Sequence, residues 1–376
     1  MALTDEDRRV PVTLLTGFLG AGKTTVLNHL IRDPDAGRIA VIMNEFGDVG
    51  LDHDLIEEAT EETVLLQSGC LCCTILGDLA KTLGALIAKK AAGKIEFDRV
   101  VIEASGISDP GPILHTLVAD RLIAATYRLD GVVTLADAVN GVRTLDTQSE
   151  ALQQIAMADL IILTKTDLVG SREIATFEVR LNAINSTARH LRATHGRVPP
   201  GSLFGLSAMR NSVSQEDILT WLGTSAPKAN PLAGLSGFAP KQKPPSTLSV
   251  INAPEQSRHD HRITTASIEV KTPISERVFD FWLDTLIAMR GPDILRMKGI
   301  VHVEEMDFPF VFHGVQHIFD APVPLKSWAG TDTTSRVVVI ARDIPKADLE
   351  ESLQVLLMRR ENAKGHMPKE TAPAPT

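Results

Sequence analysis

A glycine-rich loop near the start of the chain has the residue types and the spacing needed to hold a phosphate group. It fits the pattern G-x-x-x-x-G-K-[ST] at every fixed position and directly follows an apolar run at residues 12–15. The residues expected to contact the ligand are Gly17, Gly20, Ala21, Gly22, Lys23, Thr24 and Thr25. Glycines let backbone N–H groups turn toward a phosphate, Lys23 could reach the β- and γ-phosphates, and the Thr24 hydroxyl could bind Mg²⁺. The loop therefore predicts a mononucleotide site, and the alternative is a glycine-rich turn that binds no ligand.

All three cysteines of the chain lie within one four-residue segment, C-L-C-C. Cys70, Cys72 and Cys73 follow the apolar run 64–67, and thiolates are soft ligands that favour Zn²⁺ and other transition metals. Three thiolates supply three corners of a tetrahedron, whereas a structural zinc site normally has four protein ligands. We therefore expect a metal that can be exchanged, either Zn²⁺ or Co²⁺. The competing interpretations are small buried side chains and a redox pair.

Two carboxylates follow apolar runs at points where they could serve a nucleotide. Glu103 ends the run 100–103 and precedes Gly106, so it could hold Mg²⁺ through a water while the Gly106 N–H approaches the γ-phosphate. The alternative is a capped turn between a strand and a helix. Asp167, two residues after Lys165, could accept hydrogen bonds from the ring N–H and the exocyclic amine of guanine. Adenine lacks these donors there, although a K-x-D turn can also be only a helix-capping loop.

Other polar residues near these motifs are less specific. Thr164 stands where GTPases usually carry Asn, and Ser207-Ala208 resembles the loop that flanks guanine on its other side. Glu45 and Asp48 lie in a polar segment between the glycine-rich loop and the cysteines. Each could lend an oxygen to Mg²⁺ or to the thiolate-bound metal, or could be a solvated loop acid.

The elements that must position these residues alternate along the first part of the chain. Strands are expected at residues 12–15, 39–43, 64–67, 100–103, 131–134, 160–164 and 203–206, and helices at 23–31, 76–92 and 174–191. Strands that are almost entirely apolar are buried on both faces, so the pattern predicts an α/β fold. We expect the mostly parallel sheet of a P-loop NTPase with helices on both faces, and ligands at the carboxyl ends of its strands.

A proline-rich stretch separates this part from a second unit. We expect a P-loop GTPase domain at residues 1–223, a linker at 224–262, a smaller α+β domain with split βαβ character at 263–360 and a disordered tail at 361–376. The second unit is expected to have strands at 263–270, 295–303, 310–319 and 336–341, and helices at 275–289 and 346–359. On the helix 275–289 the predicted buried stripe is Val278, Trp282, Leu286 and Met289. His259 and His261 in the linker are more typical of solvated side chains than of metal ligands.

Composition narrows the class of partner. The chain has 376 residues and a formal net charge of -9, which argues against binding nucleic acid because phosphate contacts require a basic surface. Its apolar runs fall short of the roughly 20 residues needed to span a bilayer, and the acidic start is unlike a signal or transit peptide. We therefore expect a cytoplasmic protein without a nucleic acid or membrane partner.

With GFLGAGKTT, NEFG, CLCC, EASG and TKTD in this order, the chain resembles the CobW-type proteins, a metallochaperone family among the P-loop GTPases. The segments LRMKGIVHV, HGVQHIF and RVVVIAR look like the C-terminal domain of that family. The resemblance implies GTP hydrolysis coupled to delivery of a metal, often zinc. The implied nucleotide contacts are Gly17, Gly20, Gly22, Lys23, Thr24, Glu103 and Asp167, and the implied metal contacts are Cys70, Cys72 and Cys73. The chain departs from the family at Thr164 and in having only His259 and His261 where some members carry a long His-rich run.

These observations predict a GTPase that loads a metal into a metal-requiring client protein, and Zn²⁺ is the first candidate for that metal. Turnover without a partner should be slow, because no Arg or Gln in these motifs is placed to stabilise the transition state or to position water. The alternatives are a nucleotide-regulated metal or redox sensor and cobalt delivery for cobalamin synthesis. A small-molecule kinase is disfavoured by Asp167 and by the cysteines.

Overall fold

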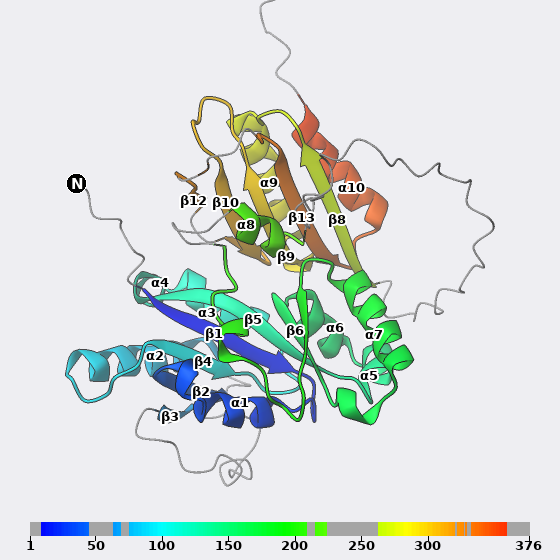
Figure 1. The fold of residues 1–376 in the computed structure, drawn as a ribbon. Helices are drawn as coiled ribbons and strands as arrows, with labels where there is room; N and C mark the ends of the chain where they lie inside the picture. The colour runs from blue at the N-terminus through cyan, green and yellow to red at the C-terminus, as the bar shows by residue number, and fades with distance from the viewer. Residues whose placement is uncertain are drawn as a thin grey trace, which may run out of the picture.

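The computed structural model describes residues 9–44, 63–68, 75–208, 215–223, 262–319, 322–326, 328 and 332–358. The chain forms two β-sheets, one in an N-terminal unit and one in a C-terminal unit, and Figure 1 shows them packed one above the other. Several predicted features lie outside the described residues, namely Glu45, Asp48, Cys70, Cys72, Cys73, His259, His261 and the tail 361–376.

The N-terminal sheet has seven strands in the order β3-β2-β4-β1-β5-β6-β7, and every neighbouring pair is parallel. Its strands are β1 (Val10–Gly17), β2 (Ile39–Asn44), β3 (Thr63–Ser68), β4 (Arg99–Glu103), β5 (Tyr127–Asp137), β6 (Leu160–Thr164) and β7 (Arg189–Arg192). The predicted parallel sheet is confirmed. Because all strands run in one direction, their carboxyl ends form a single edge, at which the glycine-rich loop, Glu103 and Thr164 are found.

Helices cover both faces of this sheet because successive side chains of each strand point to opposite sides. Leu15 packs with α1 (Lys23–Ile31) on one face, whereas Leu14 belongs to the larger core on the other face. That second face is covered by α2 (Ile75–Ala91), α3 (Gly111–Ala119), α6 (Ser149–Ala156) and α7 (Ser171–Ile184). The remaining helices of this part are α4 (Arg121–Thr126), α5 (Gly141–Thr147) and α8 (Gln215–Trp221).

The last strand of this sheet was misplaced in the sequence-based expectation. The predicted helix 174–191 stops at Ile184, because the buried side chain of Asn185 takes over the local hydrogen bonds. Asn185 Nδ2 donates to the carbonyls of Ile155, Ala156 and Ala158, and its Oδ1 accepts from the backbone of the next turn. The chain then forms β7, in which Leu191 is the single apolar residue and the side chains are exposed or only partly buried, so the strand contains no apolar run that would predict it.

The predicted strand 203–206 is wrong for a related reason. This segment follows a 3₁₀ turn at Pro200–Ser202, and Gly205 takes a positive φ of 66°. Leu203 and Leu206 are nevertheless buried in the core beside α1. The two apolar residues therefore indicated burial correctly but not strand structure.

The C-terminal sheet is antiparallel, with the order β11-β10-β9-β13-β8. Its elements are β8 (Ile263–Val270), α9 (Glu276–Arg290), β9 (Ile294–Val301), β10 (Phe310–Val315), β11 (Ile318–Phe319), β12 (Val323–Pro324), β13 (Ser335–Arg342) and α10 (Lys346–Gln354). Strand β13 lies between β8 and β9 and is antiparallel to both, which gives the split βαβ arrangement. Two expectations fail: residues 310–319 form a hairpin that turns at Gln316 (φ 56°), and Met289 is 72% exposed.

The C-terminal sheet is covered on both faces. Helices α9 and α10 cover one face, and α8 packs on the other through Ile218, Trp221 and Leu222. The N-terminal helices α3, α6 and α7 contact the same sheet. None of the helices in the described part of the chain combines the length and the apolar character that crossing a bilayer requires.

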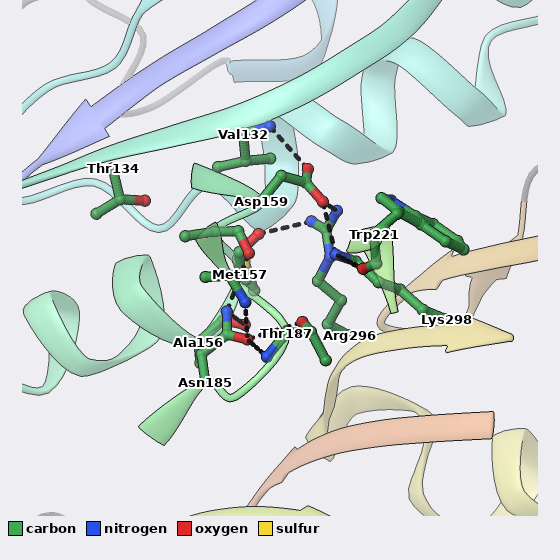
Figure 2. Close-up of polar contacts among 12 residues, drawn as sticks. Val132, Thr134, Ala156, Met157, Asp159, Asn185, Thr187, Trp221, Arg296 and Lys298 are labelled. Atoms are coloured by element: carbon green, nitrogen blue, oxygen red, sulfur yellow. Dashed lines mark hydrogen bonds and ion pairs between the residues drawn. The ribbon is translucent and has the colours of Figure 1, made fainter. Parts of the chain in front are cut away.

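A buried ion cluster joins the two units (Figure 2). Asp159, which immediately precedes β6, lies 2.5 Å from Arg296 Nη2 and 2.8 Å from Lys298 Nζ through its Oδ1 atom. Arg296 Nη1 also donates to the Met157 carbonyl, and Lys298 Nζ to the Trp221 carbonyl. The cluster thus fixes strand β9 to the amino end of β6, at the opposite end of that strand from Thr164.

Candidate nucleotide and metal site

The glycine-rich loop joins β1 directly to α1. Gly20 and Gly22 have positive φ values of 71° and 95°, a backbone region that L side chains rarely adopt, so glycine is required at both positions. Helix α1 begins at Lys23, where the sequence predicted it. Lys23 Nζ donates to the carbonyl of Gly17 at 2.8 Å, which places the ammonium group over the loop. The loop therefore presents a helix N-terminus and a cation on the same side, as phosphate binding requires.

A hydroxyl and a carboxylate meet beside this loop. Thr24 lies on α1 and Glu103 at the end of β4, the strand that pairs with β1. Thr24 Oγ1 lies 3.4 Å from Glu103 Oε1, and Glu103 is only 7% exposed. Oxygen donors of these two kinds are the ligands that Mg²⁺ prefers, so this pair fits the metal ion that accompanies nucleotide phosphates. Thr25 follows on α1, and its side chain lies against the Gly196 position.

The segment after Glu103 packs against the glycine-rich loop. A Cβ atom built on Gly106 would lie 2.8 Å from the Leu19 nitrogen and 2.9 Å from the Leu19 Cα. These are backbone atoms that cannot turn away, so only glycine allows the close approach. Ser108 closes a turn by donating from its N–H and its hydroxyl to the Ser105 carbonyl. The structure thus brings residues 105–108 to the border of the phosphate-binding loop.

Thr164 at the end of β6 contacts the phosphate-binding loop from the other side. It is buried, and its Oγ1 donates to the carbonyl of Ala21 at 2.8 Å. Thr164, which stands where GTPases usually carry Asn, therefore still donates a hydrogen bond to the loop. Its position links the loop to the turn that carries Lys165 and Asp167.

Lys165 and Asp167 lie in the turn that follows β6. Lys165 has a positive φ of 55°, and its Nζ lies 2.7 Å from Asp137 Oδ2. Burial would raise the pKa of Asp137, but hydrogen bonds from Lys165 and Asn140 lower it below its ordinary value, so this carboxylate stays ionised. Asp167 belongs to the 3₁₀ turn Thr166–Leu168, and its carboxylate is 35% exposed and free of the Lys165 pair.

The loop opposite Asp167 is not the one expected from the sequence. Ser207 and Ala208 are buried, and Ala208 packs with α8 and the C-terminal sheet. The loop near Asp167 follows β7 instead, and His195 Nδ1 in that loop lies 3.9 Å from Asp167 Oδ2. Because β7 was not foreseen, the loop that follows it was also missed. The loop makes a tight turn, with positive φ values at His195 (51°) and Gly196 (75°).

The predicted thiolate site lies outside the described residues. The strands that lead to it do not: β2, which precedes Glu45 and Asp48, and β3, which precedes the cysteines, end side by side with Asn44 paired to Ser68. Met43 of β2 is paired to Glu103. Within the described ranges, no group of three or more His, Cys, Asp or Glu residues could hold a metal ion.

One residue near the site carried no signal in the sequence. Gln154 of α6 is 1% exposed and donates from its amide to the carbonyls of Gly106 and Ser108. It belongs to none of the motifs, because its role depends on the packing of α6 behind the segment after β4. Only the three-dimensional arrangement identifies it.

Known proteins are similar to both units. Residues 11–192 match the nucleotide-binding domain "CobW/HypB/UreG, nucleotide-binding domain", and residues 263–357 match the "Cobalamin synthesis protein cobW C-terminal domain". The chain is 31% identical over 340 residues to "Zinc chaperone YjiA" of Escherichia coli, which covers 90% of this chain and 96% of that protein. It is also 31% identical over 364 residues to "Zinc-regulated GTPase metalloprotein activator 1" of Schizosaccharomyces pombe, covering 89% and 83%.

A solved structure extends the likeness to the whole fold. The crystal structure of Zn(II)-bound YjiA GTPase from E. coli has a TM-score of 0.69 and 27% sequence identity, and the match covers 93% of this chain and 99% of that one. Both units and their order in the chain are therefore shared. The chain belongs to the CobW family, with a CobW/HypB/UreG nucleotide-binding domain followed by a CobW C-terminal domain.

Proposed function

We propose that this protein is a GTP-hydrolysing metallochaperone that binds a transition metal and transfers it to a metal-requiring client protein. Zn²⁺ is the first candidate for the metal. The observation that carries the proposal is the contact between Thr24 and Glu103 at 3.4 Å beside the phosphate-binding loop. The relatives support the metal, since they are named zinc chaperone and zinc-regulated GTPase metalloprotein activator. Reduced thiolates would persist in the cytoplasm, where we place the protein.

Four sets of residues have separate roles in the nucleotide site. Lys23 neutralises phosphate charge from above the loop, and Thr24 with Glu103 holds Mg²⁺. Gly106 borders the loop at the side where a γ-phosphate would reach, and Asp167 selects guanine through its exposed carboxylate. The sequence motifs of this site contain no Arg that could stabilise the transition state, so we expect turnover to depend on a partner.

The metal site is assigned to Cys70, Cys72 and Cys73, with Glu45 or Asp48 as candidate oxygen ligands. The strands β2 and β3, which precede these residues, end beside one another, and Met43 near the end of β2 is paired with Glu103 of β4. A change at the γ-phosphate can therefore act on the segments that carry the metal ligands. We propose that the GTP state captures the ion and that the GDP state yields it to a client offering a fourth ligand.

The guanine assignment is tested with Asp167→Asn. The carboxylate accepts two donors of guanine, whereas an amide can donate to the C2 carbonyl of xanthine. The variant should lose about 2–3 kcal/mol in GTP binding, the scale of charge-assisted hydrogen bonds, and should gain use of xanthosine triphosphate. Equal hydrolysis of ATP and GTP by the unmodified protein would overturn the assignment.

The metal cycle is tested by titrating Zn²⁺ against a competing chelator in the presence of GDP or of a non-hydrolysable GTP analogue. The analogue should tighten Zn²⁺ binding, and reciprocity requires Zn²⁺ to tighten binding of the analogue by the same factor. The coupling free energy between two such sites is typically about 1–3 kcal/mol. Changing any one cysteine to Ser should weaken binding strongly, because a hydroxyl stays protonated at neutral pH. Equal dissociation constants in the two nucleotide states would rule the cycle out, and metal that never leaves during turnover would favour a sensor.

A further inference from the structure

Gln154 of α6 lies behind the segment that follows β4. Its Nε2 atom donates to the carbonyl oxygens of Gly106 and Ser108, both at 3.2 Å. Both partners are carbonyls, which only accept, so the NH₂ group must face them and the orientation of the amide is fixed by chemistry. Two backbone groups of one short segment are therefore held by a single side chain.

The helix that carries Gln154 is anchored on several sides. Thr134 Oγ1 donates to the backbone carbonyl of Gln154 at 2.9 Å. At the end of α6, Asn185 Nδ2 donates to Ile155 and Ala156, and Arg296 of the C-terminal sheet donates to Met157 at 2.6 Å (Figure 2). These bonds come from β5, from the residue after α7 and from β9. Gln154 thus projects from a support that both units hold in place.

The front of the same segment rests on the phosphate-binding loop. Gly106 is so close to Leu19 that a methyl group on Gly106 would overlap the Leu19 backbone. The segment 105–108 is therefore in contact both with the loop, through Gly106, and with Gln154, through its two carbonyls. Any shift of this segment relative to α6 must distort or break the hydrogen bonds to Gln154.

The two polar atoms of the Gln154 amide are used differently. Gln154 Oε1 is buried and has no hydrogen-bond partner among the described residues. Gln154 is one of the residues that line a cavity of ≈ 190 Å³, whose wall also includes Leu19, Gly20 and Ala21 of the phosphate-binding loop. The donors of the amide are thus used entirely on Gly106 and Ser108. A purely structural glutamine would be expected to satisfy both ends of its amide.

We propose that Gln154 is a positioning residue for the γ-phosphate: it holds residues 105–108 against the phosphate-binding loop, so that the site distinguishes GTP from GDP. This inference rests on the proposed function, because it requires that the nucleotide is GTP. GDP lacks the γ-phosphate, so on this proposal it binds through the phosphate-binding loop and Asp167 without contacting the segment. Gln154 therefore contributes to the difference between the two nucleotides and not to their common affinity.

The test compares Gln154→Met with Gln153→Met, the same change one residue earlier in α6, where the side chain is partly exposed. Dissociation constants are measured for GDP and for a non-hydrolysable GTP analogue, together with kcat and KM for GTP. Gln154→Met should weaken the analogue about tenfold, the effect of losing two hydrogen bonds of ordinary strength, and leave GDP within about twofold. It should lower kcat, and Gln153→Met should match the unmodified protein in every measurement.

A second variant covers the case in which Gln154→Met does not fold. Gln154→Glu keeps the shape but, when ionised, offers only acceptors to two carbonyls, so analogue affinity should fall and should recover at acidic pH as the carboxyl becomes a donor. An unchanged ratio of analogue to GDP affinity in a folded Gln154 variant, or equal weakening of both nucleotides, would overturn the proposal. Failure of the unmodified protein to bind GTP would instead refute the proposed function.

Discussion

Asp159 and Lys298 form an ion pair across the two units, with Asp159 Oδ1 and Lys298 Nζ 2.8 Å apart and both side chains at most 3% exposed. Burial alone would raise the pKa of Asp159, but the charges of Arg296 and Lys298 hold it well below its ordinary value. Burial also lowers the pKa of Lys298 to about 8, against the opposing effect of Asp159. Asp159 is therefore the carboxylate that compensates two buried cations.

Replacing Asp159 with Asn should destabilise the protein strongly. The amide keeps the shape of the side chain, but Arg296 and Lys298 lose their counter-charge inside the protein. Removing one partner of a buried ion pair typically costs about 3–5 kcal/mol. The free energy of unfolding, measured by denaturant titration, gives the change directly.

The matched control is Asp343→Asn. Asp343 pairs with Arg262 at 2.7 Å, yet both side chains are nearly half exposed, so its loss should cost at most about 1 kcal/mol. Similar losses for the two variants would show that the cluster of Asp159, Arg296 and Lys298 is not what joins the units.

The sequence predicts those features that are local. The strand, loop and helix around Lys23 follow from a pattern of neighbouring residues, and the helix begins where expected. In LRMKGIVHV the alternation already places Arg296 and Lys298 on one face of a strand. Their partner could not be foreseen, because Asp159 is 137 residues away from Arg296 along the chain.

The failures have the same origin. Helix α7 ends at Ile184 because the side chain of Asn185 bonds to carbonyls at the end of α6, which propensity alone does not reveal. Strand β7 is partly exposed and has Leu191 as its single apolar residue, so it lacks the apolar run of the other strands. Gln154 was missed for the same reason, since its two carbonyl partners lie 48 and 46 residues away.

Thr164→Val should weaken nucleotide binding. Valine has the same shape, but it removes the hydrogen bond to the buried Ala21 carbonyl at 2.8 Å and leaves that acceptor unpaired. The expected loss is about 1–3 kcal/mol, the cost of an unsatisfied buried group, shared between folding stability and affinity for GTP. Titration with a fluorescent GTP analogue measures the affinity. Thr164→Ser retains the hydroxyl and should bind normally, and equal affinities for all three proteins would show that the loop does not depend on this bond.

Gly106→Ala should impair GTP binding because the added methyl group meets the backbone of Leu19 at 2.8–2.9 Å. Either the phosphate-binding loop or residues 105–108 must move, and we expect at least about a tenfold loss, or about 1.4 kcal/mol. Gly84→Ala is the control, since a Cβ atom there has no neighbour within 4 Å. That change should stabilise α2 by about 0.5–1 kcal/mol and leave nucleotide affinity unaltered. Normal GTP affinity in Gly106→Ala would mean that the contact with Leu19 is dispensable.

Acidification should destabilise the C-terminal unit through His302. This residue is 8% exposed, its Nε2 has no hydrogen-bond partner among the described residues, and its ring lies 5.8 Å from that of Trp328. Burial lowers the pKa of His302 below its ordinary value, with Asp332 opposing and Arg336 assisting the shift. Below about pH 6.5 the unfolded chain therefore binds a proton at this residue that the folded chain does not. As the pH is lowered through this range, the free energy of unfolding should decrease by at most about 1.4 kcal/mol per pH unit for this group.

The readout is the slope of unfolding free energy against pH between about 7 and 5, the range that brackets the ordinary pKa of histidine. His302→Gln cannot take up this proton, so its slope should be shallower than that of the unmodified protein even if the substitution lowers stability at every pH. If His302→Gln and the unmodified protein give parallel curves, the imidazole of His302 is protonated equally in the folded and unfolded chain, and the acid sensitivity must come from other groups.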